Sequence, residues 1–265
     1  NIFRKRFHTY MKQSERLEII IDTLQREGKV KVSDLSLKLG CSEVTIRNDI
    51  RKLDDQGVLK KTYGGAVQKQ DGLSVSFMPG EFFLNGEEKQ RIALKAYEYI
   101  DNRDSIIIDD STTGCYLAKI IHEHPEKNLI VVTNSLFVAA ELSQAKHVDL
   151  FVAGGHTLGT PPSTLDNFTV SAFQNFNVNK AFVGVNGINL NAGLTSIGTP
   201  QMETKRAIIQ SAGQTFVIAD STKFGSSNLF TVCAMDQIHA VITDSKVSKE
   251  ILSTAHKNNI SIIAV

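Results

Sequence analysis

The stretch CSEVTIRNDIRKLDDQGVLKKTYGGA, residues 41–66, decides the fold of the first part of the chain. Ser42 is a natural helix N-cap, because its hydroxyl can accept a hydrogen bond from a free amide of the first turn. An apolar stripe at helical spacing follows, formed by Ile46, Ile50 and Leu53. Gly57 is expected to end this helix, because glycine tolerates the left-handed conformation that a helix end often needs.

The face of this predicted helix opposite the stripe carries groups that can reach base edges and phosphates. They are Glu43, Val44, Thr45, Arg47, Asn48 and Arg51. Residues 58–65 then indicate a short β-hairpin with basic and aromatic side chains, Lys60, Lys61 and Tyr63. A helix that ends in a basic hairpin is typical of a winged helix-turn-helix domain. We therefore expect both sets of side chains, together with the cap Ser42, to contact DNA.

Two more short helices are predicted upstream. The first has an apolar stripe, formed by Leu17, Ile20, Ile21 and Leu24, and ends at Gly28. Ser33, also a candidate DNA contact, is expected to cap the second, which buries Leu35 and Leu39 and ends at Gly40. An isolated amphipathic surface helix is the alternative for residues 42–57. Three short helices with tight connections favour the helix-turn-helix arrangement.

Residues 12–66 resemble the N-terminal domain of DeoR-type bacterial transcription regulators. The resemblance depends on Arg16, on the run Ser42-x-x-Thr45-Ile46-Arg47-x-Asp49-Ile50-x-x-Leu53, and on the ending Gly57-x-Leu59-x-x-x-Tyr63-Gly64-Gly65-Ala66. Asn48 stands where most members carry arginine, which bears on base preference. The resemblance implies that this part of the chain binds double-stranded operator DNA.

Charge is unevenly distributed along the 265 residues, although the net charge is only +1. Residues 1–69 contain 15 Lys+Arg and 9 Asp+Glu, whereas residues 70–265 contain 14 and 19. A basic segment suits a phosphate backbone and an acidic one does not, so the two parts are expected to have different partners. We predict a DNA-binding domain at 11–67, a polar linker at 68–84, and a second domain at 85–265.

The three cysteines, Cys41, Cys115 and Cys233, form neither a metal-binding spacing nor an even set for disulfides. This pattern favours a reducing cytosol, and we expect a cytoplasmic protein. His122 and His124 are two residues apart and do not share a helix face, so we interpret them as surface residues and not as metal ligands. Neither a metal site nor a cofactor is predicted. No apolar run approaches membrane-spanning length, so no membrane partner is expected.

Short apolar runs alternate with helical patterns in the second domain. Strands are predicted at 105–109, 129–133, 148–153, 180–185, 215–219, 239–243 and 261–265. Helices are predicted at 87–100, 113–123, 135–144, 166–176, 200–212 and 246–258. This alternation predicts an α/β domain with a parallel sheet covered by helices on both faces.

Polar clusters follow the predicted strands at their carboxyl ends, where open parallel sheets bind ligands. The candidate ligand contacts are Asp109, Asp110, Ser111, Thr112, Thr113, Thr133, Asn134, Ser135, Gly154, Gly155, Asn186, Gly187, Asp220 and Lys223. A single cluster is more readily explained as a helix cap or turn. Several clusters at one edge favour a binding site.

The side chains in these clusters suit a phosphorylated polyol or sugar. Ser111, Thr112 and Thr113 open a helix and can offer hydroxyls and free amides to a phosphate. Lys223 can add a cation. The aspartates repel phosphate but accept hydrogen bonds from sugar hydroxyls.

The resemblance to DeoR-type regulators continues through this second domain. It includes Glu88-Lys89-x-Arg91-Ile92-Ala93, Asp109, Thr112-Thr113, Thr133-Asn134-Ser135, Gly154-Gly155, Lys180-Ala181-Phe182-x-Gly184, Gly193-Leu194-Thr195 and Asp220-Ser221-Thr222-Lys223-Phe224-Gly225. It implies an effector domain with a fold similar to sugar-phosphate isomerases. The chain departs from the family pattern in three places where ligand can lie. The family usually reads Asp-Ser-Gly-Thr-Thr, whereas this chain has Asp109-Asp110-Ser111-Thr112-Thr113. Leu158 stands where a basic residue is common, and Asp166 stands where glycine is usual.

The function predicted is a repressor of a sugar or sugar-alcohol catabolic operon, released from DNA by a phosphorylated sugar. One alternative is an isomerase, with Asp109, Asp220 and Lys223 as base and electrophile. A second is an effector domain that serves only for oligomerisation. The N-terminal domain favours the regulator, because an isomerase has no use for it. One recognition helix covers a short half-site, so a homodimer or homotetramer is expected.

Overall fold

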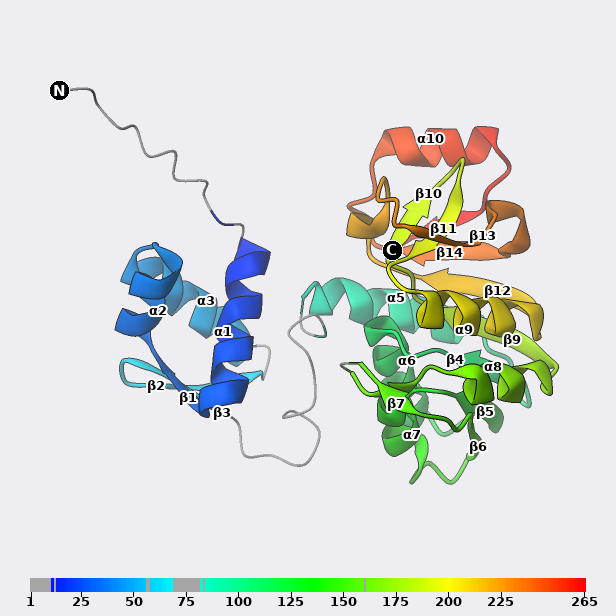
Figure 1. The fold of residues 1–265 in the computed structure, drawn as a ribbon, viewed down its shortest axis with the longest axis horizontal. Helices are drawn as coiled ribbons and strands as arrows, with labels where there is room; N and C mark the ends of the chain where they lie inside the picture. Colours follow the sequence, from blue (N-terminus) through cyan, green and yellow to red (C-terminus); the bar gives the residue numbers. More distant parts are fainter. Residues whose placement is uncertain (1–10, 12, 56–57, 69–81, 83, 160) are drawn as a thin grey trace. The chain divides into compact units, whose positions relative to one another are not determined.

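The computed structural model describes residue 11 and residues 13–55, 58–68, 82, 84–159 and 161–265 (Figure 1). The chain divides into two compact units, Asn1–Leu84 and Asn85–Val265. Gly57 and most of the predicted linker lie outside the described residues. In the described part of the chain, no helix combines the length and the apolar character needed to cross a membrane.

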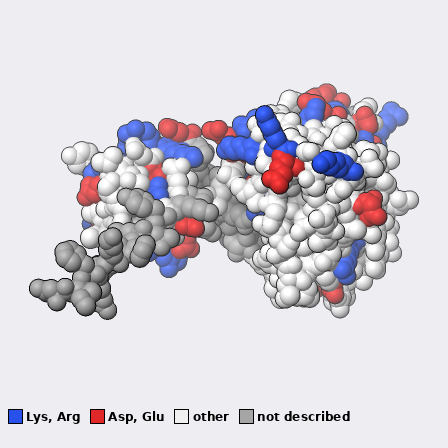
Figure 2. All heavy atoms as spheres, turned by 90° about the horizontal axis from the view of Figure 1, so that it is seen from above, with Lys and Arg blue, Asp and Glu red and all other residues white. Residues whose placement is uncertain are grey.

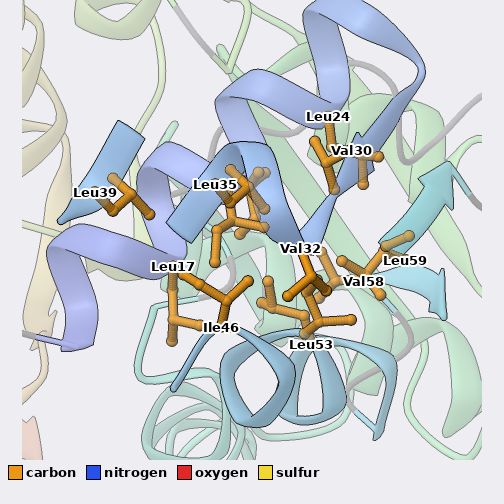
Figure 3. Packing of buried hydrophobic residues seen from close by; sticks show 14 residues of the cluster. Leu17, Leu24, Val30, Val32, Leu35, Leu39, Ile46, Leu53, Val58 and Leu59 are labelled. Atoms are coloured by element: carbon orange, nitrogen blue, oxygen red, sulfur yellow. The ribbon is translucent and has the colours of Figure 1, made fainter. Parts of the chain in front are cut away.

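The first unit is a three-helix domain with a small antiparallel sheet, which confirms the predicted winged helix-turn-helix fold. Its elements are α1 (Gln13–Glu27), β1 (Lys29–Lys31), α2 (Val32–Leu39), α3 (Glu43–Asp55), β2 (Leu59–Thr62) and β3 (Gly65–Gln68). The strands lie in the order β1-β3-β2. Figure 3 shows the apolar faces of the helices meeting around Leu35 and Ile46, with Leu59 of β2 closing the core.

The helix ends follow local chemistry, with one exception. Gly28 and Gly40 have φ values of 71° and 63°, as expected for glycines that end helices. Ser42 Oγ accepts a hydrogen bond from the Thr45 amide at 3.2 Å. The prediction that Ser33 caps α2 is wrong, because the helix begins at Val32 and its N-cap position is Lys31. Its first amide, that of Val32, donates to the Gly64 carbonyl at 2.9 Å, so the wing takes the place of a side-chain cap.

Strand β1 was not predicted, because its pattern spans only three residues. It pairs with β3, and Val30 lies opposite Ala66. The neighbouring Gly65 allows this close pairing, since a Cβ there would lie 2.0 Å from the Val30 carbonyl oxygen. Only glycine fits at this position.

The second unit contains a seven-stranded parallel sheet, formed by all the predicted strands. The strands are β4 (Ser105–Ile108), β5 (Leu129–Thr133), β6 (Val148–Val152), β9 (Val178–Val183), β12 (Ala212–Ile218), β14 (Ala240–Thr243) and β15 (Ile262–Ala264). The helices are α5 (Gly86–Glu98), α6 (Thr112–Glu123), α7 (Leu136–Leu142), α8 (Asn167–Gln174), α9 (Thr199–Gln210) and α10 (Lys249–Lys257). The predicted α/β class is confirmed.

Helices cover both faces of the sheet (Figure 1). On one face, Ile107, Val132 and Ala181 of the strands pack with Phe173 of α8 and Ile208 of α9. On the other face α5 contacts α6, and α6 contacts α7. Helices therefore pack against both faces of the sheet.

The strand order is β15-β14-β12-β9-β4-β5-β6. The chain starts at β4, adds β5 and β6 on one side, and then crosses to add β9 and the later strands on the other. The order reverses between β4 and β9. In open parallel sheets the ligand-binding crevice lies at such a switch point.

Short antiparallel elements and one helix end differ from the predictions. The additional strands are β7 (Thr157–Leu158), β8 (Ser163–Thr164), β10 (Gly187–Asn189), β11 (Gly193–Ser196) and β13 (Phe230–Cys233), and two 3-10 turns lie at Ser221–Lys223 and Met235–Gln237. The helix predicted to reach residue 212 ends at Gln210. Ser211 Oγ donates to the carbonyl oxygens of Phe173 and Ala207, and Ala212 already pairs with β9.

Candidate functional sites

The predicted DNA contacts lie at the surface of the first unit. Those that are exposed are Ser33, Ser42, Glu43, Val44, Arg47, Asn48, Arg51, Lys60, Lys61 and Tyr63, and Thr45 is partly buried. On α3 they occupy the face opposite Ile46, Ile50 and Leu53, which are at most 1% exposed. This is the geometry that a recognition helix requires.

Two contacts order the start of α3. Arg47 Nη2 lies 2.9 Å from Glu43 Oε2, one turn away, and both side chains are about half exposed. Ser42 Oγ lies 2.9 Å from Thr45 Oγ1, in addition to capping the Thr45 amide. The guanidinium of Arg47 is thus held at the surface of the helix, where it can meet a base edge.

Arg16 and Asp49 belong to the interior of the domain and not to its binding face. Arg16 Nε donates to Asp49 Oδ2 at 2.8 Å, and the Asp49 side chain is 1% exposed. Gln13 Nε2 donates to the other carboxylate oxygen at 2.9 Å. The hydrogen bond with Asp49 raises the pKa of Arg16, so the guanidinium stays charged. This pair fixes α1 against the recognition helix.

Charges of both signs are mixed on the face of each unit seen in Figure 2. Lysine and arginine side chains stand beside aspartate and glutamate side chains there. On that face, the imbalance between the two halves of the sequence does not produce a surface of a single sign.

The predicted effector contacts form a row along the carboxyl edge of the sheet. From one side to the other the row follows β12, β9, β4, β5 and β6. Neighbouring strands are about 4.8 Å apart, so the row is roughly 19 Å long. One small ligand cannot touch all of it. The residues around the β4–β9 switch point are therefore separated from Gly154 and Gly155 at one end and Asp220 and Lys223 at the other.

Burial divides these candidates further. Asp109, Thr113, Thr133, Asn134, Ser135, Gly187 and Asp220 are buried, Asp110, Ser111, Thr112, Asn186 and Lys223 are partly exposed, and Gly154 and Gly155 are exposed. A ligand that enters from solvent first meets the partly exposed group. The buried group supports it from below.

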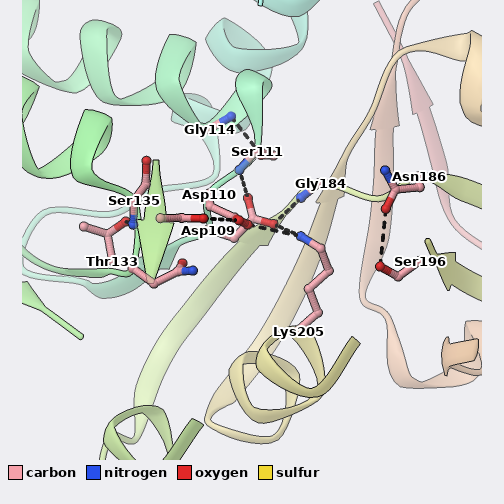
Figure 4. Close-up of polar contacts among 12 residues, drawn as sticks. Asp109, Asp110, Ser111, Gly114, Thr133, Ser135, Gly184, Asn186, Ser196 and Lys205 are labelled. Carbon is pink, nitrogen blue, oxygen red and sulfur yellow. Dashed lines mark hydrogen bonds and ion pairs between the residues drawn. The ribbon is translucent and has the colours of Figure 1, made fainter. Parts of the chain in front are cut away.

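Asp109 is the centre of the switch-point cluster (Figure 4). Its Oδ1 accepts from the Ser111 amide at 3.0 Å, and its Oδ2 accepts from the Gly184 amide at 2.9 Å. Gly184 follows β9, so the carboxylate joins the two strands at which the order reverses. A Cβ on Gly184 would lie 2.3 Å from Ser111 Cβ, so the close approach needs glycine. Asp109 is fully buried with these partners, which makes it a support for the site.

Lys205 completes this cluster and was not predicted. It extends from α9, is 6% exposed, and its Nζ lies 2.5 Å from Asp109 Oδ2 and 3.6 Å from Asp110 Oδ1. Burial alone would lower the pKa of Lys205, but the attraction of the two aspartates raises it above its ordinary value. The lysine is therefore a cation. A signal existed, because Lys205 precedes the buried Ile208 and Ile209 by three and four residues, on the same helix face.

A hairpin from the loop after β6 covers the neighbouring strand end. Ser163 Oγ of β8 donates to Asp110 Oδ2 at 2.8 Å, and Ser163 is also bridged to Ser135. Asn134 Nδ2 donates to the Thr164 carbonyl at 3.0 Å. Within the described part of the chain Asn134 Oδ1 is buried without a hydrogen-bond partner. Such an acceptor is a candidate for a ligand or an ordered water.

Helix α6 starts beside Asp110. Ser111 is its N-cap, and its Oγ accepts from the Gly114 amide at 3.1 Å. The earlier amides of Thr112 and Thr113 belong to the part of a helix that lacks intrahelical acceptors. Burial raises the pKa of Cys115, one turn into this helix, to about 12, so its thiol stays protonated.

The groups farther from the switch point have structural partners of their own. On the β9 side, Ser196 Oγ donates to Asn186 Oδ1 at 3.3 Å (Figure 4). Asp220 accepts from both the amide and the hydroxyl of Thr222, two residues along the chain. Lys223 is partly buried in the same turn. The predicted pairing of Asp220 with a ligand hydroxyl or with Lys223 thus stays a prediction.

Gly154 and Gly155 lie at the other end of the row. A Cβ on Gly155 would lie 2.4 Å from Asp166 Oδ1. Asp166 caps α8 through the Thr169 amide at 2.9 Å, and its other oxygen accepts from the His156 amide at 2.7 Å. These backbone bonds lower the pKa of Asp166. The aspartate organises this loop from the position where the family pattern has glycine.

Comparisons with known proteins match both units. Residues 16–71 match the DeoR-like helix-turn-helix domain, and residues 84–245 match the DeoR C terminal sensor domain. The "Putative aga operon transcriptional repressor" of Escherichia coli O157:H7 is 32% identical over 95% of this chain and 94% of that protein. The glycerol-3-phosphate regulon repressor of Escherichia coli K12 is 27% identical over 95% of this chain and 99% of that protein.

The chain also has a likeness to a solved enzyme structure. The ribose 5-phosphate isomerase A of Methanocaldococcus jannaschii matches 53% of this chain and 55% of its own, with a TM-score of 0.40 and 14% sequence identity.

Proposed function

The chain belongs to the DeoR family of transcriptional regulators, and from this premise we propose that it represses a catabolic operon for a sugar or sugar alcohol until a phosphorylated sugar binds its sensor domain. Its relatives include repressors named for the aga operon and for the glycerol-3-phosphate regulon. Operator DNA binds to the outer face of α3 and to the wing, through Arg47, Asn48, Arg51, Lys60 and Lys61.

The observation that carries the proposed effector site is the cluster at the β4–β9 switch point. Lys205 already lies between two aspartates, Asp109 and Asp110, so the centre of the cluster has no free cation for a phosphate. It is suited to hydroxyl groups, which Asp110 can bind as an acceptor. The sugar hydroxyls are thus assigned to Asp110, Asn134 and Asn186.

The phosphate is assigned to the adjoining start of α6. The amides of Thr112 and Thr113 point along the helix axis, and the helix dipole favours an anion there. Lys223 lies at the end of β12, two strand spacings or roughly 10 Å from β4. The long lysine side chain can cover part of this distance, so its ammonium group can approach a phosphate bound at the start of α6. Of these groups, Asp110, Thr112, Asn186 and Lys223 are partly exposed, so a ligand can reach them from solvent.

A panel of compounds tests the effector, with the full-length chain in thermal-shift and operator-release measurements. The panel contains sugar phosphates, sugar-alcohol phosphates, the same compounds without phosphate, and inorganic phosphate. A ligand at about 100 times its dissociation constant should stabilise the sensor by roughly 2.7 kcal/mol. The phosphorylated compound should also release the operator, and its unphosphorylated counterpart should do neither.

Three outcomes contradict different parts of this proposal. A compound that stabilises the chain without releasing the operator contradicts a role for that compound in induction. No stabilisation by any phosphorylated compound favours a domain that serves only for assembly. Turnover of a sugar phosphate by the chain would favour the isomerase alternative, which the regulator relatives do not support.

We also propose that the regulator binds as a homodimer or homotetramer. Two-fold symmetry presents two recognition helices to half-sites about one helical turn apart, or a multiple of it. Sedimentation of the chain with and without operator measures this. A monomer that protects a single half-site would contradict it.

A further inference from the structure

Val44 is an apolar side chain that stands exposed in the first turn of α3. Its exposed fraction is 67%, although valine is among the residues most often buried. In the described part of the first unit, Leu37 of α2 is another exposed aliphatic side chain, at 85%. Val44 therefore adds nothing to the core of the domain, and its position needs another explanation.

The position of Val44 on the helix is central to the exposed face. Val44, Arg47, Asn48 and Arg51 are spaced as i, i+3, i+4 and i+7, so they form one stripe. At about 100° per residue, Val44 points roughly 160° away from the buried Ile46. The N-terminal residues of a recognition helix are those that contact base edges. Val44 is the second residue of α3 and lies in that part.

Its neighbours in the first turn already have polar partners. The Glu43 carboxylate is paired with Arg47, and the Thr45 hydroxyl is bonded to Ser42. Val44 offers only methyl groups. In the major groove, the apolar feature that base pairs present is the C5 methyl group of thymine.

We propose that Val44 contacts the C5 methyl group of one thymine in each operator half-site and thereby selects thymine at that position. This inference depends on the proposed function, since it requires α3 to lie in the major groove. Arg47 and Asn48 have hydrogen-bonding groups suited to guanine and adenine. Val44 thus adds recognition of thymine through its methyl group, which the hydrogen-bonding groups of Arg47 and Asn48 do not provide.

Uracil provides a direct test, because it forms the same hydrogen bonds as thymine and lacks only the methyl group. The operator is first selected from random duplex DNA by the full-length chain, and each of its thymines is then replaced by deoxyuridine in turn. We expect one position in each half-site at which the replacement weakens binding about fourfold, the factor that corresponds to burial of one methyl group.

Substitutions at residue 44 assign this effect. Val44→Ser should bind thymine and uracil operators equally at that position, because serine has no methyl group and a helix propensity close to that of valine. Val44→Thr keeps one methyl group and should retain part of the preference. Leu37→Ser is the matched control, an exposed aliphatic residue on another helix, and should keep the full wild-type preference.

The outcomes separate this inference from the function on which it depends. If the selected DNA binds equally well with uracil at every position, the proposed role of Val44 is wrong, but the proposed function is not contradicted. The same holds for a thymine preference that persists unchanged in Val44→Ser. A chain that selects no DNA from the pool contradicts the proposed function, and the role of Val44 with it.

Discussion

Lys205 Nζ of α9 lies 2.5 Å from Asp109 Oδ2 at the end of β4, and both side chains are buried. The two residues are 96 positions apart in the sequence. Because the same carboxylate oxygen accepts from the Gly184 amide, the pair joins α9 to both strands of the switch point. A ligand in this place meets a rigid, charged support.

Removal of the cation should destabilise the sensor unit strongly. Lys205→Met leaves the carboxylate of Asp109 buried and unpaired, and breaking a buried pair in this way costs about 3–5 kcal/mol. Urea unfolding of the full-length chain measures the loss. Lys95→Met is the control, because the pair that Lys95 forms with Glu98 lies at the surface, where solvent screens it, and should contribute much less. Equal losses in the two variants would mean that Lys205 is not held as an ion pair.

The loop that Asp166 organises is expected to be sensitive to acid. The pKa of Asp166 is lowered, mainly by the backbone hydrogen bonds from His156 and Thr169. A carboxyl group with a lowered pKa in the folded state stabilises that state above its unfolded pKa. The stabilisation is lost as the pH falls through the lower, folded value. The protection of the residue 156 and 169 amides from hydrogen exchange should therefore fall, relative to amides in the rest of the sheet, as the pH falls through this acid range.

Asp166→Asn supplies the control for this pH dependence. Asparagine does not titrate, and its single carbonyl oxygen can still accept one of the two amide hydrogen bonds. The variant should show no acid transition at residues 156 and 169. An identical transition in the variant and the wild type would assign the effect to another group.

Arg47 is expected to be a main source of operator affinity. Loss of a bidentate contact to guanine costs about 1–3 kcal/mol, so Arg47→Ala should weaken operator binding by about 5- to 150-fold at fixed salt. Binding to random DNA should fall much less. Arg26→Ala is a matched control, since Arg26 is also exposed and paired one turn away, with Asp22, but lies on α1. Unchanged operator affinity in Arg47→Ala would reject the assigned face of α3.

Local patterns were sufficient to predict the main elements of the fold. The stripe of Ile46, Ile50 and Leu53 gave α3 its buried face, and runs such as residues 106–108 gave the strands of the sheet. Strand β1 and the short strands β7, β8, β10, β11 and β13 have too few residues for a pattern. Their existence depends on partners far away in the sequence, as Val30 depends on Ala66.

The sequence predicted which polar residues lie at the carboxyl edge of the sheet, but not how deeply each is buried. Residues that follow parallel strands were correctly expected at one edge, because strand direction determines this. The sequence did not show that the carboxylate oxygens of Asp109 accept hydrogen bonds from backbone amides, or that Lys205 pairs with one of them. A lysine is ordinarily assigned to the surface, and only its spacing from Ile208 and Ile209 indicated otherwise. Charge neutralisation inside a protein depends on tertiary contacts.

Lys223 tests the extent of the effector site. It follows β12, on the β9 side of the switch point, and we expect it to neutralise the effector phosphate. Lys223→Ala should fold and bind the operator as the wild type does, because the residue is remote in sequence from the DNA-binding unit. It should lose the response to effector, since a ligand changes DNA affinity only through its own differential binding to the two states.

The expected phenotype is a repressor that the sugar phosphate cannot release. The thermal shift that the effector gives the wild type, roughly 2.7 kcal/mol at about 100 times its dissociation constant, should be much smaller in Lys223→Ala at the same concentration. Lys249→Ala is the control, an exposed lysine at the start of α10, and should keep both responses. If Lys223→Ala also keeps both, the lysine supports only its own turn. The phosphate must then bind entirely at the amides of Thr112 and Thr113, since they are the remaining groups at this edge to which we assign it.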